Sequence, residues 1–240
     1  MTDRPILFSA PMVRALIDGR KTQTRRAFSS LRGRQCRHIS EFGRSDTLGF
    51  DWHFRDDGKR WHDLRHAELL PRLKYRTSDR LWVKEIWRPF SIDLAPWDIE
   101  VAYAADGERR IINDGEFGDN DWTIPKAAER GNVSPLFMPR WASRLTLTVT
   151  DVRVERLQDI SEDDAVAEGC FKGKASGRIF ANESAMHLGG DEWANARDWY
   201  ADLWEEINGA GAWEANPWVA AYTFTVHRGN IDERGSADDA

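Results

Sequence analysis

Hydrophobic residues alternate with polar residues in four stretches of the chain, and in three others they recur with a helical period. The alternation predicts strands over residues 80–87, 100–104, 144–157 and 218–227. The helical spacing predicts helices over residues 9–18, 161–169 and 192–207. Strands and helices are interspersed without a regular β-α-β repeat. The pattern therefore favours the α+β class, as a small mixed β-barrel with flanking helices.

The ends of the predicted helices carry the residue types that start and stop helices. Ser9 and Ser161 stand at N-cap positions, where a serine hydroxyl accepts a hydrogen bond from a free backbone N–H group. Gly19 and Gly169 follow the first two helices, where glycine adopts the conformation that ends a helix. The segment after Gly19 therefore begins directly at the end of the first helix.

Two long stretches lack either period and predict loop insertions. Residues 29–76 are polar and rich in Arg and His, with a short helix predicted near His62–Leu70, and residues 106–134 are rich in Gly, Asp and Asn. No internal repeat or linker is present. We therefore predict a single domain over residues 1–228 with insertions at about 29–76 and 106–134, followed by a polar, disordered tail over residues 229–240.

The composition indicates a soluble protein of the cytoplasm. Hydrophobic residues make up 41% and charged residues 31% of the chain, and no apolar run approaches the ~18 residues that cross a bilayer, so no membrane partner is expected. The N-terminus lacks the apolar stretch of a secretory signal. The two cysteines, Cys36 and Cys170, are far apart and predict free thiols in a reducing compartment.

The charge is unevenly distributed along the chain. Residues 1–90 hold 20 Lys and Arg against 11 Asp and Glu, whereas residues 91–240 hold 14 against 29. A basic N-terminal part suggests an anionic partner such as nucleic acid. The alternative is that the two parts neutralise each other in the folded protein.

The segment Gly19–Arg26, with sequence GRKTQTRR, contains the residues best suited to chemistry. Crowded positive charge lowers the pKa of a lysine, so Lys21 is a candidate base or nucleophile, and Thr24 is a candidate hydroxyl group beside it. Arg20, Arg25 and Arg26 are candidate phosphate ligands. The alternative is a solvated basic turn after a helix.

Two further sets of residues complete the candidate site. Glu85 shares a strand face with apolar residues, and a carboxylate there is either functional or a strand-end residue that reaches solvent or pairs with an arginine. Arg140, Trp141 and Arg144 precede a strand and either bind phosphates and stack on bases or form a packing cluster. Cys36, His38, His62 and His66 match no metal-site spacing, so neither a metal nor another cofactor is predicted.

Several blocks along the chain together resemble the ASCH family, a relative of the PUA fold, and most closely the longer ASCH-domain proteins of tailed phages and prophages. The blocks are PILFSAPMV (5–13), GRKTQTRR (19–26), DRLWVKE (79–85), MPRWASR (138–144), LQDISE (157–162), LWEEING (203–209) and NPWV (216–219). The resemblance covers nearly the whole chain and is weakest over residues 29–76 and 106–134.

The resemblance implies a small, partly open β-barrel beside a cleft, with RNA or modified nucleosides as ligands. One small bacterial branch hydrolyses the acetyl amide of N4-acetylcytidine with a Lys, a Thr and a Glu, which fall here on Lys21, Thr24 and Glu85. Other members are described as ribonucleases. This chain is more than twice the length of that branch, so the substrate does not carry over directly.

These observations predict a protein that binds nucleic acid or a modified nucleoside, with RNA, DNA or a modified base held in a basic cleft. Two alternatives remain open: an amidohydrolase that deacylates N4-acylated cytidine-type nucleosides through Lys21, Thr24 and Glu85, and a ribonuclease.

Overall fold

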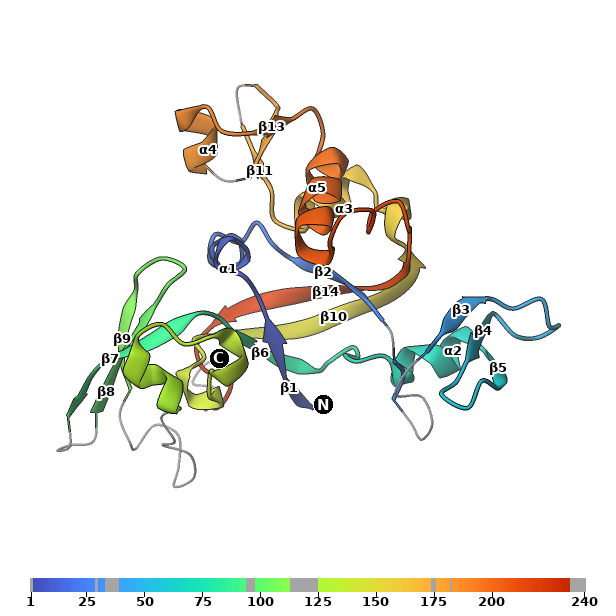
Figure 1. Cartoon of the computed structure of the whole chain (residues 1–240), viewed down its shortest axis with the longest axis horizontal. Coiled ribbons are helices and arrows are strands. Elements are labelled where there is room, and N and C mark those ends of the chain that lie inside the picture. The colour runs from blue at the N-terminus through green and yellow to red at the C-terminus, as the bar shows by residue number, and fades with distance from the viewer. Residues whose placement is uncertain are drawn as a thin grey trace, which may run out of the picture. The chain divides into compact units, whose positions relative to one another are not determined.

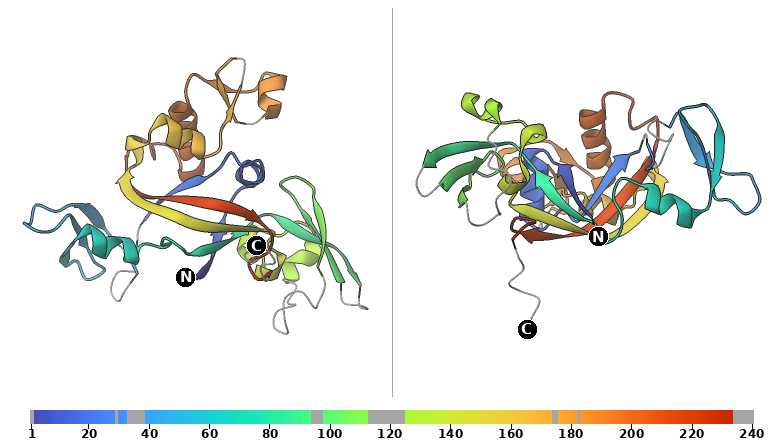
Figure 2. Two further views of the ribbon diagram at one scale, coloured as in Figure 1. Left: turned by 180° about the vertical axis from the view of Figure 1, so that it is seen from behind. Right: turned by 90° about the horizontal axis from the view of Figure 1, so that it is seen from below.

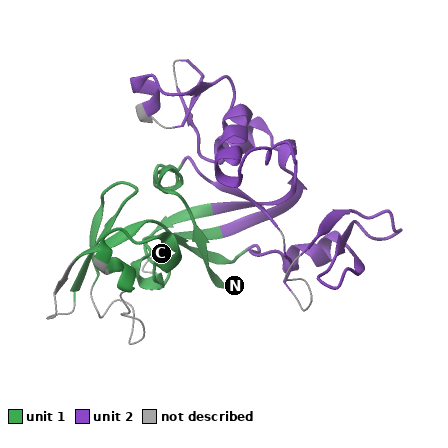
Figure 3. Cartoon of the chain, in the orientation of Figure 1, with its two compact units in different colours: residues 1–19, 78–148, 225–240 green, residues 20–77, 149–224 purple. Residues whose placement is uncertain are grey.

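The computed structural model describes residues 2–28, 30–32, 39–93, 98–112, 125–173, 176–181 and 183–233 (Figures 1 and 2). The chain divides into two compact units (Figure 3). Unit 1 comprises residues 1–19, 78–148 and 225–240, and unit 2 comprises residues 20–77 and 149–224.

The principal sheet has the strand order β1-β6-β10-β14-β2. In unit 1, β1 (Asp3–Leu7) pairs in parallel with β6 (Arg80–Lys84), which pairs antiparallel with the start of β10 (Leu145–Arg156). Alternate side chains of these strands, including those of Ile6, Leu81 and Val83, are buried. The helix α1 (Ala10–Ile17) follows β1 and buries its apolar stripe.

A second sheet in unit 1 carries most of its remaining core. It consists of β7 (Trp87–Asp93), β8 (Asp98–Tyr103) and β9 (Arg109–Ile112), all antiparallel. Trp87, Val101 and Tyr103 on one face join a hydrophobic cluster with Met138 and Trp141. The 3-10 helices η3 (Lys126–Arg130), η4 (Pro135–Phe137) and η5 (Arg140–Ala142) lead from this region towards β10.

In unit 2, β2 (Gln23–Ala27) pairs antiparallel with β14 (Trp218–Arg228). The 3-10 helix η6 (Leu157–Asp159) and the helices α3 (Glu162–Ala167) and α5 (Ala196–Asn208) follow β10 along the chain. Ser161 caps α3 through the Asp164 N–H, as predicted, and Asn195 caps α5. A small sheet of β11 (Phe171–Lys172), β12 (Ile179–Phe180) and β13 (Glu192–Trp193) also belongs to this unit, as does α4 (Glu183–Leu188).

The predicted loop insertion at 29–76 contains a sheet of its own. Its strands are β3 (Glu41–Arg44), β4 (Trp52–Arg55) and β5 (Trp61–Leu64), followed by α2 (His66–Leu69) and the 3-10 helix η1 (Leu70–Arg72). The loop prediction is wrong for these residues, although the short helix was expected. Each strand has only four residues, too few for the alternation to stand out, yet Trp52 and Phe54 are fully buried.

The structure confirms some of the remaining predictions, contradicts others and leaves some untested. The mixed α+β class is confirmed, but the strands of the described residues form four open sheets and close no barrel. The single domain over residues 1–228 stays a prediction. Residues 229–233 of the predicted tail are part of unit 1, with Asn230 and Ile231 buried, while 234–240 lie outside the described residues. Among the helices described, none is long and apolar enough to cross a membrane.

Candidate functional site

Lys21 lies buried in unit 2 against the end of α3. Its ammonium Nζ donates hydrogen bonds to the Glu168 carboxylate and to the Glu168 carbonyl oxygen, each at 2.8 Å. Burial lowers the pKa of Lys21 below 10.5, the Glu168 charge opposes that change, and Arg26 and Arg25 add to it. The predicted direction is confirmed, but burial rather than crowding by arginines is the largest cause.

Arg25 is the centre of the same charged cluster. Its guanidinium group is fully buried and contacts Glu155 at 2.8 Å, Asp164 at 2.9 Å and Glu168 at 3.1 Å. Strand β2 directs this side chain and that of Gln23 towards α3, since the two residues are two positions apart. Three carboxylates occupy the donors of Arg25, so it presents no free fork to a phosphate.

Thr24 does not join Lys21 and Arg25. It lies between Gln23 and Arg25 in β2 and therefore points to the opposite face of the strand, across from Tyr222 of β14. Arg20 donates to the carbonyl oxygens of Gly169 and Cys170. Arg26 is half-buried and, by the same alternation, lies on the same face of β2 as Thr24. Lys21, Thr24 and Arg25 of the segment 19–26 are therefore buried, and the segment is not an open basic surface.

Glu85 belongs to unit 1 and faces Arg144. Both of its carboxylate oxygens accept hydrogen bonds from that guanidinium group, at 2.9 and 3.0 Å. Burial raises the pKa of Glu85 above 4.5, and the hydrogen bonds and charge of Arg144 oppose the shift. The geometry therefore supports the alternative of an ion-paired glutamate. Glu85 pairs with Arg144, whereas Lys21 pairs with Glu168.

The remaining predicted ligands are also engaged within unit 1. Arg140 pairs with Asp3 at 2.6 Å and with Asp232 at 2.5 Å. The indole ring of Trp141 is buried and packs edge-on against Trp87, with 5.6 Å between the ring centroids, so it presents no face to a base. The packing-cluster alternative describes this segment better.

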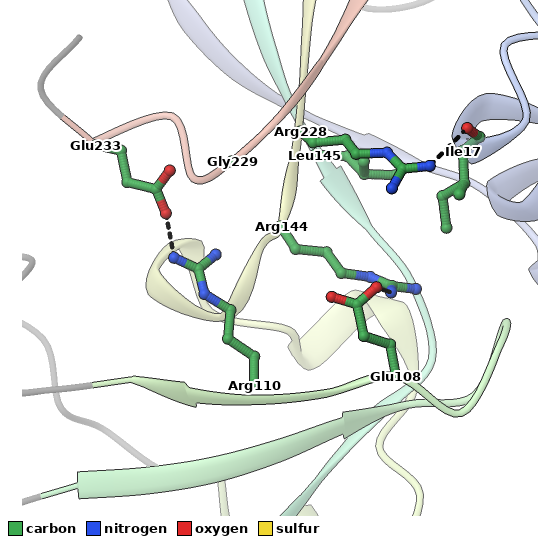
Figure 4. Close-up of a pocket in the computed structure, with 8 residues that line it drawn as sticks. All are labelled: Ile17, Glu108, Arg110, Arg144, Leu145, Arg228, Gly229 and Glu233. Atoms are coloured by element: carbon green, nitrogen blue, oxygen red, sulfur yellow. Dashed lines mark hydrogen bonds and ion pairs between the residues drawn. The ribbon is translucent and has the colours of Figure 1, made fainter. Parts of the chain in front are cut away.

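A pocket of about 220 Å³ opens in unit 1, beside Arg144 (Figure 4). The elements around it supply side chains from distant parts of the chain: the end of α1, β9 and the turn before it, the start of β10, and the end of β14 with the segment after it. The lining residues are Ile17, Glu108, Arg110, Arg144, Leu145, Arg228, Gly229 and Glu233. Among the predicted site residues, Arg144 is one that lines this pocket.

Arg144 holds one wall of this pocket rigidly. Besides Glu85, its guanidinium group contacts Asp106 at 2.8 Å and Glu108 at 2.7 Å, and its central carbon lies 4.1 Å from the centre of the Tyr103 ring. Burial lowers the pKa of Arg144, but the hydrogen bonds and charges of Glu85 and Asp106 outweigh it and raise that pKa overall, so the group stays charged. With every donor nitrogen engaged, Arg144 orients Glu108 towards the cavity.

The other walls carry a second pair and a bridging arginine. Arg110 pairs with Glu233, and Arg228 donates to the carbonyl oxygen of Ile17 at 3.0 Å (Figure 4). Three arginines and two glutamates therefore line the pocket. Two more carboxylates, those of Glu85 and Asp106, contact Arg144 without lining the pocket. The pocket offers both donors and acceptors and has no surplus of positive charge, unlike the basic cleft that the sequence predicted.

The pattern of the sequence gave no sign of Glu108, Arg110, Arg228, Glu233 or Glu168. All but Arg110 lie in turns or at the ends of elements, and pairs such as Arg110 with Glu233 join residues far apart along the chain. A local motif could not have found them, although one residue of the block 138–144, Arg144, was predicted as a site residue and does line the pocket.

The histidines and cysteines stay apart. His62 contacts Asp56 at 2.8 Å, and His66 accepts a hydrogen bond from Trp52 at 3.1 Å. Cys170 is a buried free thiol whose pKa burial raises to about 11, whereas Cys36 and His38 lie outside the described residues. Within the part of the chain described, no group of three or more His, Cys, Asp or Glu residues is arranged to hold a metal ion.

Comparisons with known proteins add no relative to this picture. No protein-family model, curated protein or solved structure matches the chain. The resemblance to the ASCH family therefore stays a prediction, and the functional argument rests on the geometry of the site.

Proposed function

We propose that the protein binds a nucleobase, as a free or modified nucleoside or as a nucleotide unit of RNA or DNA, in the pocket of unit 1. The observation that supports this proposal is the meeting of arginine donors and glutamate acceptors in one small cavity. Many polar ligands carry both hydrogen-bond acceptors and donors that could meet these side chains. Among them we choose a nucleobase because the chain resembles the PUA-like ASCH family.

The size of the pocket suits one compact ring system. Its volume of about 220 Å³ lies below the ~300 Å³ at which cavities for drug-sized ligands begin. A single base fits such a space better than a larger cofactor. A connected sugar would then extend outward, because the pocket opens to solvent.

The charge of the pocket favours a base over a phosphate. Glu108 is 54% exposed at its side chain and can accept from an exocyclic amino group, as carboxylates accept from cytosine N4. Arg110 and Arg228 lie on the other walls and can donate to ring nitrogens or carbonyl oxygens of the base. The nearby carboxylates would repel a phosphate, so a neutral polar ring is the better ligand.

The two alternative activities gain no support from the described residues. The Lys21 amine faces Glu168, Thr24 points to the other face of β2, and Glu85 is held by Arg144. The amidohydrolase and ribonuclease readings therefore stay predictions without a contact that favours them.

A nucleoside-binding experiment tests the proposal. Titration of a panel of free nucleosides, N4-acetylcytidine included, is expected to show saturable binding by calorimetry. Glu108→Gln and Arg228→Gln should each lower the affinity for the best ligand by about tenfold or more, because a hydrogen bond to a charged group contributes about 1.5–3 kcal/mol. Both side chains are at the surface, so the fold should persist.

The matched control is Arg178→Gln, which removes an exposed arginine of unit 2 that pairs with Glu192. This variant should bind like the wild-type protein. Absence of binding across the panel, or equal affinities for the two pocket variants and the control, would show that the pocket does not serve this function.

A further inference from the structure

A second pocket, of about 290 Å³, lies in unit 2 at the start of α5. The helices α3 and α5 pack against each other in this unit (Figure 1). The pocket is lined by α3, by the first turns of α5 with its cap, and by the segment that follows α5. The lining residues are Glu162, Asn195, Arg197, Asp198, Ala201 and Trp213.

The backbone N–H groups at the start of α5 are already bonded, so this pocket is more than a bare helix terminus. The Glu162 carboxylate accepts hydrogen bonds from the N–H groups of Ala196 and Arg197, at 2.7 and 3.2 Å. The Asn195 side chain accepts from the Asp198 N–H at 2.9 Å and donates to the Asp198 carboxylate at 2.7 Å. What the pocket offers a ligand is therefore its side chains.

Arg197 and Asp198 carry opposite charges at neighbouring positions of α5 but do not pair. Neighbouring helix positions point about 100° apart, so their side chains do not face each other. The Arg197 guanidinium group donates to the Gln158 carbonyl oxygen at 2.8 Å and has no carboxylate partner among the described residues. One carboxylate oxygen of Asp198 accepts from Asn195, and in the described part of the chain the other has no partner.

Trp213 supplies an aromatic wall whose backbone is fixed on both sides. Its N–H donates to the Glu205 carboxylate at 2.7 Å, and its carbonyl oxygen accepts from the Gln158 side-chain amide at 2.9 Å. Its ring packs edge-on against the buried Tyr200, with 6.3 Å between the ring centroids. Since Gln158 also holds Arg197, one residue sets the positions of both the ring and the cation.

The two unpaired charges indicate a ligand that carries both signs. A carboxylate would pair with Arg197 and an ammonium group with Asp198, because each charged side chain is best matched by a hydrogen-bonding group of opposite charge. A carboxylate and an ammonium group together are the common part of every free α-amino acid. Ala201 adds only a methyl group to the lining, which leaves room for the ligand's side chain beside Trp213.

The net charge of the lining favours a basic amino acid. Two carboxylates and one guanidinium group give a net charge of −1. The second carboxylate, that of Glu162, accepts one N–H at each oxygen and keeps free lone pairs for a further donor. A cationic side chain would also be attracted to the face of the Trp213 indole ring. The other charged residues of α5 are acidic as well: Asp202, Glu205 and Glu206.

We propose that the pocket at the start of α5 binds a free basic α-amino acid, with its carboxylate on Arg197, its ammonium group on Asp198 and its side-chain cation beside Glu162 and Trp213. The volume of about 290 Å³ is close to the ~300 Å³ at which cavities for small ligands begin. One amino acid fits this space better than a larger cofactor. The pocket belongs to unit 2 and the proposed nucleobase pocket to unit 1, so neither proposal depends on the other.

Calorimetric titration of the full chain with L-arginine tests the proposal, and saturable binding is expected. Two analogues each remove one end group: agmatine lacks the carboxylate, and desamino-arginine lacks the α-ammonium group. Each should bind about tenfold or more weakly than L-arginine, because each loses a hydrogen-bonded ion pair. L-Leucine lacks the side-chain cation and should also bind more weakly, and L-glutamate should not compete.

Three variants locate the binding site. Asp198→Asn keeps the shape of the side chain but removes its charge, and should lower the affinity for L-arginine about tenfold or more. Arg197→Gln should lower it as well and abolish the preference for L-arginine over agmatine. The matched control is Glu206→Gln, which removes the same charge from an exposed residue of α5 outside the pocket and should bind as the wild type does.

Absence of L-arginine binding would overturn the proposal, as would equal affinity for agmatine, L-leucine or L-glutamate. Equal losses in Asp198→Asn and Glu206→Gln would overturn it too, because binding would then respond to the general charge of α5. The analogue series uses the wild-type protein, so it remains a test even where a variant fails to fold.

Discussion

Replacement of Glu168 by Gln tests whether the charged cluster of unit 2 stabilises the fold rather than performing chemistry. Glu168 is buried, its side chain is 3% exposed, and its carboxylate holds both Lys21 and Arg25. A glutamine has the same shape but removes the negative charge that the buried ammonium of Lys21 contacts at 2.8 Å. Arg25 keeps Glu155 and Asp164, so most of the loss falls on Lys21.

Breaking a buried ion pair by removing one partner destabilises a protein by about 3–5 kcal/mol. We expect Glu168→Gln to lower the free energy of unfolding by about that amount. Lys21→Met added to Glu168→Gln removes the stranded ammonium, so the double variant should recover stability, with a coupling of about 1–3 kcal/mol between the two sites.

The assay is urea unfolding followed by tryptophan fluorescence, with the slope m compared between variants so that a change in midpoint reports stability. The control is Arg178→Gln, which breaks an exposed pair with Glu192 and should change the free energy by less than about 1 kcal/mol. A loss for Glu168→Gln no larger than that of the control, or no recovery in the double variant, would refute the reasoning.

Two further predictions concern stability. The Asn230 side-chain amide donates to the carbonyl oxygens of Arg140, Trp141 and Ser143, at 2.8, 3.1 and 2.8 Å. Asn230→Ala should therefore destabilise by about 2–3 kcal/mol in urea unfolding, and no change would mean that this segment is not anchored. For Asp164, burial raises the pKa, but the Gln23 hydrogen bond and the charges of Arg25 and Arg153 lower it below 3.8 overall. A lowered folded pKa gives stability that is present above 3.8 and lost as the pH falls through the folded pKa, so the difference between wild type and Asp164→Asn should shrink in unfolding curves taken towards about pH 3. A difference that stays constant with pH would contradict this.

The long periodic elements could be read from the sequence because their patterns are local. The strand predicted at 144–157 is β10, Leu145–Arg156, and the helix predicted at 192–207 is α5, Ala196–Asn208. The strand predicted at 80–87 is confirmed as far as Lys84, after which the chain turns at Glu85 and starts β7 at Trp87. Apolar alternation continues through that turn, so the pattern alone does not mark the break.

The candidate site was harder to predict because its contacts join distant residues. GRKTQTRR looks like a basic surface when only its own charges are counted. In the fold, Arg25 meets Glu155 and Glu168, more than a hundred residues away, so two of the segment's cations, Lys21 and Arg25, are buried and paired with carboxylates. The same holds for Arg144, whose partner Glu85 was a candidate for chemistry and is its structural counter-ion.

The alternation along β9 has a consequence for how this protein can change over evolution or in the laboratory. Arg109 and Arg110 lie on opposite faces of the sheet, so a point substitution can change the outer face through Arg109 or the pocket through Arg110 without touching the other. A one-residue insertion or deletion in the preceding turn, where Gly107 has a φ of 77°, would instead exchange the two sets of side chains. The two surfaces can therefore diversify separately by substitution, but they are lost together by a change in length.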